Sequence, residues 1–388
     1  MIRIIFVFIF LLLLSGCASK HLHPKHQKKI ALVEENYTIL VALEAEKSHQ
    51  YQFAYKAFMK LYKKTKNKEY LHKALQDQFF LKNYQQTLDI IADLPKKEQQ
   101  DPFIVQLKAF ALFHLKQYNK SLMYLNQLYK QNYDNKIIAK IATILYFYLD
   151  KKEEAIKRLQ AHAQLNGCSE EICLKLVYFY AKANNIDALL HTYLKFYNLK
   201  KDKVVAQKII QIYLYQQKYP QLIEFLEKSH ANDKLLLSLY ITKKDYKKAS
   251  KLAHTLYLQT GDISYLGQNA IFEYESSPHK EDKKTLQKVI TKLQDVIKQQ
   301  PNTLYLNYLG YLLIDHNLDI TKGIQYVKDA LKQEPNSFYY LDSLAWGYYK
   351  EGKCNDAKII MDKVIQLKGT NNKEVQKHIK QINQCIGE

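Results

Sequence analysis

A recurring pair of residues, an aromatic followed three positions later by a small or apolar residue, most constrains how this chain can fold. The clearest pairs are Tyr51/Ala54, Tyr84/Thr87, Tyr118/Ser121, Tyr219/Leu222 and Tyr246/Ala249, and the less aromatic members of the series are Ala155, Ala188, Val289, Gly323 and Ala357. Successive second positions lie 33 or 34 residues apart, except for one interval of 27 that is followed by one of 40. Because these two intervals sum to 67, one displaced turn near Ala249 restores the phase. A period of this length indicates stacked structural repeats.

Each repeat has the sequence pattern of a helix pair. From about residue 30 onward, apolar residues recur at helical spacing in segments of 11 to 16 residues, which short polar turns separate. The 388 residues include only 10 glycines and 7 prolines, too few for the many turns of a sheet-rich fold. Since a single helix pair cannot bury both of its faces, we expect the pairs to stack into one continuous solenoid without a separate second domain.

The repeats resemble the tetratricopeptide repeat family, and the last two units carry the resemblance most clearly. Their matching residues are Leu309-Gly310, Gly323 and Ala330 in the first, Leu344-Ala345, Tyr348, Gly352 and Ala357 in the second, and Pro301, Pro335 and Gly369 at the closing positions. One extra residue lies in the internal turn between Asp315 and Ile320. The resemblance covers roughly residues 30–370. It implies an all-α, right-handed superhelix of about ten helix-turn-helix repeats, which a capping helix at residues 371–388 closes.

The first residues of the chain have the layout of a secretory signal. Arg3 precedes an unbroken apolar run, Ile4–Leu14, which as a helix rises about 16 Å and falls well short of the roughly 30 Å hydrocarbon core. The following residues resemble the lipobox of bacterial lipoproteins, which here consists of Leu14, Ser15, Gly16 and Cys17. This resemblance implies a signal peptide at residues 1–16 and a mature chain whose first residue, Cys17, carries fatty acyl chains such as palmitate.

The residues after Cys17 predict where the anchored chain resides. Ala18 follows the cysteine, and the absence of Asp there resembles lipoproteins sent to the outer membrane. We therefore expect a lipid-anchored outer-membrane protein that faces the periplasm. Residues 17–29 include three histidines, but on a flexible segment these have no geometry that selects a metal, so we interpret the segment as a solvated tether.

With Cys17 acylated, four cysteines remain, an even number that fits an oxidising compartment. Cys168 and Cys173 are close in sequence, and we expect them to form one disulfide. Cys354 begins the second helix of the last repeat, and Cys385 ends the capping helix. Because two antiparallel helices of similar length bring these residues to the same end, we expect a second disulfide between them.

The positive charge of the chain is large but diffuse. Lys and Arg total 58 against 38 Asp and Glu, a net charge of +20, and the only arginines are Arg3 and Arg158. Nucleic-acid recognition usually exploits the bidentate guanidinium group, so we expect no nucleic-acid partner. Phosphate-loop, nucleophile-elbow and zinc-protease signatures are absent from the sequence. We therefore expect no catalytic residues, no metal and no cofactor, and a protein that is not an enzyme.

The family resemblance implies that the first helices of the repeats line a concave face. On that register the inward residues of the last two units are Asn307, Tyr311, Tyr339, Asp342, Trp346 and Tyr349. Rigid aromatic side chains beside polar anchors are how such grooves bind peptides. For Trp346, the only tryptophan, packing against the neighbouring repeat is the competing interpretation. The lysine and asparagine pattern of a dicarboxylate clamp is not evident.

Three hypotheses for function remain open. The last two units resemble those of outer-membrane tetratricopeptide lipoproteins, which implies a non-catalytic adaptor that binds periplasmic or membrane proteins through its concave groove. A second hypothesis is a structural component of an envelope machine, such as a pilus pilotin, a flagellar-motor scaffold or the β-barrel assembly complex. The third is a protein that binds peptidoglycan or lipopolysaccharide, because both are anionic and the chain is basic.

Overall fold

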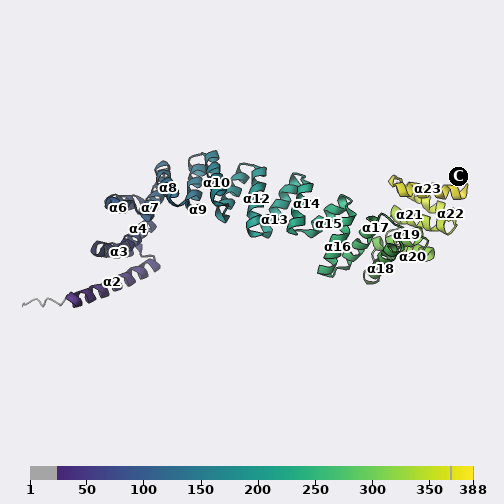
Figure 1. Ribbon diagram of the computed structural model, residues 1–388, viewed down its shortest axis with the longest axis horizontal. Coiled ribbons are helices and arrows are strands. Elements are labelled where there is room, and N and C mark those ends of the chain that lie inside the picture. Colours follow the sequence, from purple (N-terminus) through teal and green to yellow (C-terminus); the bar gives the residue numbers. More distant parts are fainter. Residues whose placement is uncertain (1–23, 368, 388) are drawn as a thin grey trace, which may run out of the picture. The chain divides into compact units, whose positions relative to one another are not determined.

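The computed structural model describes residues 24–367 and 369–387, which fold into helices joined by short turns, with no strand among them (Figure 1). The predicted signal peptide, the lipobox residues Leu14, Ser15 and Gly16, and Cys17 lie outside the described residues. The chain forms two compact units, and the boundary between them lies between Val205 and Ala206. We refer to these as the N-terminal unit and the C-terminal unit.

The N-terminal unit consists of consecutive helix-turn-helix pairs with one additional short helix. Its helices are α2 (Pro24–Lys47), α3 (Tyr51–Thr65), α4 (Lys68–Phe80), α5 (Tyr84–Ala92), α6 (Lys96–Gln99), α7 (Pro102–His114), α8 (Tyr118–Asn132), α9 (Asn135–Tyr148), α10 (Lys152–Asn166), α11 (Glu170–Lys182) and α12 (Ile186–Lys200). Side-chain caps begin many of them; at α9, for example, the Asp134 carboxylate accepts a hydrogen bond from the Ile137 amide at 2.9 Å.

The C-terminal unit continues the same alternation. Its helices are α14 (Tyr219–Ser229), α15 (Asp233–Thr242), α16 (Tyr246–Thr260), α17 (Ile263–Glu275), α18 (Lys283–Gln299), α19 (Thr303–Asp315), α20 (Ile320–Gln333), α21 (Phe338–Lys350), α22 (Cys354–Gln366), the 3-10 helix η1 (Gly369–Asn371) and α23 (Lys373–Ile386). Helix α13 (Lys203–Tyr215) contains the boundary between the units. Within the described residues, no helix has both the length and the apolar character that crossing a membrane requires.

The recurring residue pair of the sequence marks where the two helices of a pair meet. Each of the five aromatics is the first residue of a second helix (α3, α5, α8, α14 and α16). The residues three positions later are fully buried: Ala54, Thr87, Ser121, Leu222 and Ala249. In one pair, the Ser121 hydroxyl donates a 2.7 Å hydrogen bond to the carbonyl oxygen of Ala109 on the first helix. Small residues at these positions therefore allow the close crossing that the sequence predicts.

The closest crossing joins α19 to α20 through two glycines. A Cβ atom on Gly310 would lie 2.7 Å from the backbone oxygen of Gly323, and a Cβ on Gly323 would lie 2.7 Å from the oxygen of Gly310. No side chain fits at either position without separating the helices. The turn that follows, residues 316–319, is one residue longer than the corresponding turn at 351–353, as predicted. The fold is thus an all-α solenoid of the tetratricopeptide type.

The displaced interval in the sequence has a local structural cause. Helix α14 has 11 residues where α16 has 15, and α15 has 10 residues where α17, α19 and α21 each have 13, so the next second helix begins early. The connection between α17 and α18 then extends over residues 276–282, and α18 itself has 17 residues, which together restore the phase. In α18 both Leu286 and Val289 are buried, and Leu286, three residues after the start, takes the place that the pattern assigned to Val289.

Two expectations about the organisation of the chain differ from the structure. Helix α2 begins at Pro24, inside the segment 17–29 that was expected to be a flexible tether. Proline suits the first turn of a helix because its fixed φ is helical and its missing amide has no partner to lose there. The chain also forms two compact units, whose boundary lies within α13, where no separate second domain was expected. A local repeat pattern specifies each helix pair but does not specify how many pairs form one compact unit.

The chain ends in the predicted capping helix. Helix α23 packs against both α21 and α22 through its buried residues Val375, His378 and Ile382. Lys373, Lys377 and Lys380 of the same helix are exposed, so its polar face is turned toward solvent. A terminal helix of this kind covers the apolar surface that the last repeat would otherwise leave open.

Candidate functional site

The C-terminal unit contains a pocket of about 600 Å³ between the end of α17, the helices α19 and α21, and the start of α23. Four of the residues predicted from the sequence line it: Asn307, Tyr311, Tyr339 and Asp342. Tyr274 and Tyr308 add two further aromatic side chains, and Tyr340 a third. We call this cavity the tyrosine pocket. Its volume falls in the range of sites that bind a small molecule or a few side chains of a peptide.

Hydrogen bonds from tyrosine hydroxyls to neighbouring groups fix the pocket's walls. The Tyr308 hydroxyl donates to Oε1 of Glu275 at 2.7 Å, and the Tyr311 hydroxyl donates to Oε1 of Glu374. Burial, and then the charge of Glu275, raises the pKa of Tyr308 well above its ordinary value. Burial, and then the charge of Glu374, does the same to the pKa of Tyr311. Both hydroxyls therefore remain protonated donors under all physiological conditions.

Carboxylates dominate the charge of the lining. The acidic residues that line the pocket are Glu275, Glu281, Asp315, Glu334, Asp342 and Glu374. Lys280 is the one lysine of the lining in the described structure, and it forms a 3.0 Å ion pair with Glu275. A chain with a net charge of +20 thus carries an acidic pocket.

Trp346 forms part of the structure behind the pocket. Its side chain is 3% exposed, its Nε1 donates a 3.0 Å hydrogen bond to Oδ1 of Asp315, and its ring stacks on His378 of α23 with centroids 4.1 Å apart. The ring of Tyr349 stacks on the indole of Trp346 with centroids 4.8 Å apart, and neither residue lines the pocket. The burial of Trp346 against His378 fits the packing interpretation, and direct contact of Trp346 and Tyr349 with a partner stays a prediction.

A buried pair joins the capping helix to the floor of the pocket. His378 Nδ1 lies 3.0 Å from Oδ1 and 3.1 Å from Oδ2 of Asp342, and both side chains are buried. The imidazole N–H can satisfy the carboxylate, which without a partner would be costly to bury. Asp342 therefore lines the pocket as predicted, but one of its functions is to hold α23 in place.

Asn307 differs from Asp342 in lacking a partner for its side-chain oxygen. It lines the pocket from α19, and its side-chain oxygen Oδ1 is buried without a hydrogen-bond partner. Buried acceptors are normally satisfied, but this oxygen has almost no accessible surface, so it is not open to a ligand in the pocket.

Tyr308, Asp315 and the acidic residues from neighbouring elements were not predicted from the sequence. Asp315 lies four residues after Tyr311 on the same helix face, so extending the predicted inward stripe by one turn would have included it. Tyr308 lies beside Asn307 and widens the same stripe. Glu281 and Glu374 come from a turn and from the capping helix, and no local sequence signal indicates that they meet here.

The structure brings both predicted cysteine pairs to disulfide distance. The Cα atoms of Cys168 and Cys173 lie 5.4 Å apart, and those of Cys354 and Cys385 lie 5.7 Å apart. The second pair connects the start of α22 to the end of α23, the arrangement expected from two antiparallel helices. It therefore ties the capping helix, and with it one wall of the tyrosine pocket, to the last repeat.

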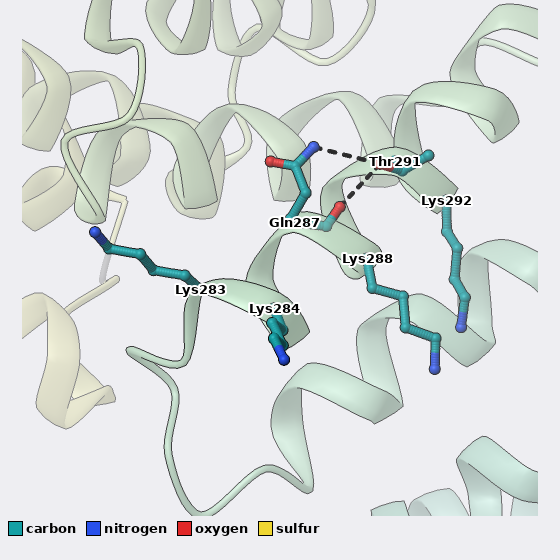
Figure 2. Close-up of a pocket in the computed structure, with 6 residues that line it drawn as sticks. All are labelled: Lys283, Lys284, Gln287, Lys288, Thr291 and Lys292. Carbon is teal, nitrogen blue, oxygen red and sulfur yellow. Dashed lines mark hydrogen bonds between the residues drawn. The ribbon is translucent and has the colours of Figure 1, made fainter.

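A second charged region lies on α18, where lysines recur along the exposed side of the helix (Figure 2). We call Lys283, Lys284, Lys288 and Lys292 the lysine surface. The ammonium groups of Lys288 and Lys292 form ion pairs with the two carboxylate oxygens of Glu273 on α17. Lys283 and Lys284 are exposed at the start of the helix. This region is open to solvent rather than enclosed.

Among the described residues, no group of three or more histidine, cysteine, aspartate or glutamate side chains is placed to hold a metal ion. The most perturbed buried carboxyl lies in the N-terminal unit. Asp77 of α4 is fully buried, and neither of its carboxylate oxygens has a hydrogen-bond partner. Burial, and then the charge of Glu46, raises the pKa of Asp77 to about 7. It lies in the helix packing, and no pocket residue accompanies it.

No family model matches the chain, and no curated protein matches it either. Among solved structures, the chain is similar to the APC/C hetero-tetramer Cut9-Hcn1, with 10% identity, coverage of 92% of this chain and 98% of that one, and a TM-score of 0.43. It is also similar to the structure of Naa15/Naa10 bound to HypK-THB, with 11% identity and a TM-score of 0.35. That match covers 90% of this chain and 66% of the other chain, just under two thirds of its length. A tetratricopeptide repeat protein from Parabacteroides merdae has 11% identity, coverage of 64% and 99%, and a TM-score of 0.28. These likenesses are distant, and the fold described above rests on the helices of this chain.

Proposed function

We propose that the chain is a non-catalytic adaptor that binds a segment of a partner protein in the tyrosine pocket. The observation that carries this proposal is the pocket itself, in which tyrosines and polar side chains from three successive inner helices surround about 600 Å³. Aromatic rings provide contact area at low entropic cost, and polar groups fix the orientation of a bound peptide. Tyr339 is 56% exposed at the edge of the pocket and is free to contact a partner.

The proposal is tested by capturing partners from detergent-solubilised envelopes and identifying them by mass spectrometry. Tyr339→Ser removes an exposed ring from the pocket, so it should reduce the yield of a specific partner at least tenfold without loss of stability. The matched control is Tyr215→Ser, because Tyr215 is 75% exposed and does not line the pocket. Equal recovery of every partner by the two variants would contradict the proposal.

We also propose that Cys17 anchors the chain to the outer membrane and that the partners are periplasmic or membrane proteins. The residues Leu14, Ser15 and Gly16 before Cys17 support this, as does the even number of remaining cysteines. In cells fed a palmitate analogue, the chain should acquire the label and fractionate with outer membranes, whereas Cys17→Ala should do neither. Labelling of Cys17→Ala at the level of the unaltered chain would contradict this placement.

Binding to peptidoglycan or lipopolysaccharide is the second candidate function, and the lysine surface is the observation that favours it. Ammonium groups at the start of α18 are exposed to solvent, where they can meet anionic polymers. In this case the chain should sediment with purified sacculi at physiological salt, and Lys283→Ser with Lys284→Ser should abolish sedimentation. Unchanged sedimentation of this double variant would exclude the lysine surface as the binding site.

A further inference from the structure

The charges that line the tyrosine pocket indicate the chemistry of its occupant. The inference drawn from them rests on the function proposed above. Its lining has six carboxylates and one lysine, the reverse of the composition of the whole chain. Lining charges of one sign in a partly enclosed cavity reinforce one another and attract the opposite charge. We propose that the pocket binds a cationic side chain, arginine or lysine, of a partner's peptide segment.

Four of the six carboxylates are oriented by neutral donors, which hold them in place but leave their charge. Glu374 accepts from the Tyr311 hydroxyl, Asp315 from the indole of Trp346 and Glu334 from the Thr303 hydroxyl. Glu275 accepts from the Tyr308 hydroxyl but is also paired with Lys280. Glu281 and Asp342 lie beside the histidines His316 and His378. A carboxylate has two oxygens and can accept several hydrogen bonds, so each retains acceptor capacity after one such bond. The pocket is therefore arranged for a donor that also supplies positive charge.

The carboxylates act on the same small region. The pKa of Tyr274 is raised first by burial and then by the charges of Asp315, Glu275 and Glu374. These groups come from α17, α19 and α23, so negative potential from three elements converges on one side of the cavity. A single ammonium or guanidinium group placed there would interact with more than one of them.

The tyrosine rings provide the second, independent observation. Tyr311 and Tyr339 line the cavity, and Tyr339 is 56% exposed at its edge. Arginine and lysine side chains are donors only, with five and three N–H groups respectively. A cation in the pocket would donate to the carboxylates, and the faces of Tyr311 and Tyr339 would add cation–π attraction. A carboxylate or phosphate would meet repulsion.

The test uses the full-length chain in mild detergent and four synthetic peptides with blocked ends, GSGRSG, GSGKSG, GSGQSG and GSGESG. Binding is measured by calorimetry and by the fluorescence of Trp346, the only tryptophan, which lies behind the pocket bonded to Asp315. The arginine and lysine peptides should bind at least tenfold more tightly than the glutamine peptide, the glutamate peptide should not bind, and raising the salt concentration should weaken the cationic peptides.

Two variants identify the site. Glu374→Gln keeps an acceptor for Tyr311 but removes the charge. Glu281→Gln removes a charge that is 90% exposed and lies 3.2 Å from Nδ1 of His316, so solvent screens it more strongly. Glu374→Gln should weaken the arginine peptide at least fivefold and Glu281→Gln about twofold. Both should leave the glutamine peptide unchanged. Glu224→Gln is the control, because Glu224 is an exposed glutamate of the C-terminal unit that does not line the pocket.

The outcomes separate this inference from the proposed function. If the glutamine peptide binds as tightly as the arginine peptide and Tyr339→Ser weakens both, the pocket binds peptides but not through their charge, and the inference is overturned alone. If the cationic peptides bind but Glu374→Gln and Glu281→Gln bind them unchanged, the cation lies elsewhere and the inference is also overturned. If no peptide binds, both the inference and the proposed pocket fail.

Discussion

The tyrosine pocket and the lysine surface belong to the same unit and carry opposite charge, but they hold that charge in different ways. In the pocket, carboxylates from several elements are fixed by hydroxyl and indole donors, as Glu275 is by Tyr308. On the lysine surface, the side chains come from one helix (Figure 2). Lys283, Lys284 and Lys288 are exposed, whereas Lys292 is 16% exposed, and Glu273 is the shared partner of Lys288 and Lys292. An exposed charge is screened and mobile, whereas an enclosed and oriented one can select a ligand.

This difference shows why the net charge of the chain does not predict the charge of the pocket. The value of +20 is a sum that the exposed lysines dominate, and it correctly describes most of the surface. The recognition site that we propose has the opposite sign, and it depends on contacts between residues as far apart as Tyr311 and Glu374.

The largest expected effect comes from removing the support on which the pocket rests. Gly323→Val would place side-chain atoms against the backbone oxygen of Gly310, so we expect destabilisation of the C-terminal unit by about 4 kcal/mol. The same change should abolish peptide binding in the pocket. Chemical denaturation followed by Trp346 fluorescence measures the loss of stability. The control is Gly352→Asn, because Gly352 has φ +76° and open space around it; equal effects of both changes would contradict the crossing.

The next effect concerns the disulfide that holds one wall of the pocket. Cys354→Ser with Cys385→Ser opens a covalent link between residues 31 positions apart, which should cost about 3 kcal/mol of stability and increase hydrogen exchange in α23. Cys168→Ser with Cys173→Ser, where the separation is 5, should cost less and leave exchange in α23 unchanged. Free reaction of both thiols of Cys354 and Cys385 in protein isolated from an oxidising compartment would show that the bond does not form.

Asp77 tests the idea that a carboxylate needs an oriented donor. Because its pKa is raised to about 7 in the folded N-terminal unit, against 3.8 when unperturbed, the folded state keeps the proton that the unfolded chain releases. This contribution to stability is complete below about pH 4 and is lost as pH rises through 7, by about 2.5 kcal/mol between pH 5 and pH 8. Asp77→Asn should remove this part of the pH dependence, as measured by denaturation at the two pH values. A variant whose stability changes with pH as in the unaltered chain would contradict the assignment.

A smaller effect is expected at the buried pair behind the pocket. His378→Ala leaves the carboxylate of Asp342 without its donor and uncovers the ring of Trp346, so we expect a loss of about 1.5 kcal/mol and a red shift of the tryptophan emission. Lys380→Ala on the exposed side of the same helix should change neither quantity. An unshifted emission spectrum in His378→Ala would mean that α23 does not cover Trp346.

The smallest effect is expected on the lysine surface. Lys283→Ser with Lys284→Ser should change stability by less than about 0.5 kcal/mol, because exposed charges contribute little. It should leave binding of the arginine peptide to the tyrosine pocket within twofold of the unaltered chain, as calorimetry would show. A loss of peptide binding in this variant would mean that the two charged regions are not independent.

The sequence was most informative where a physical constraint repeats locally. The residue three positions into each second helix must be small or well packed, and this requirement alone located Ala54, Ser121 and Gly323 at helix crossings. The inward stripe of α19 followed from the same register, which placed Asn307 and Tyr311 in the pocket.

Contacts that depend on distant elements were not predictable in this way. Tryptophan is common in peptide-binding sites, so the sequence placed Trp346 on the binding face. Only the position of α23 shows that the ring of His378 covers it. The acidic character of the pocket likewise depends on Glu281 and Glu374, which reach it from a turn and from the capping helix. The division into two units has no counterpart in the repeat pattern, because each helix pair satisfies that pattern on its own.

Site-specific photo-crosslinking in living cells tests whether partner proteins bind in the tyrosine pocket. A photoreactive amino acid at position 339 should give a discrete adduct with a partner, and the crosslinked peptide should contain arginine or lysine. The same amino acid at position 215, which is exposed but outside the pocket, should not give that adduct. An adduct of equal yield from both positions, or none from position 339, would contradict the account.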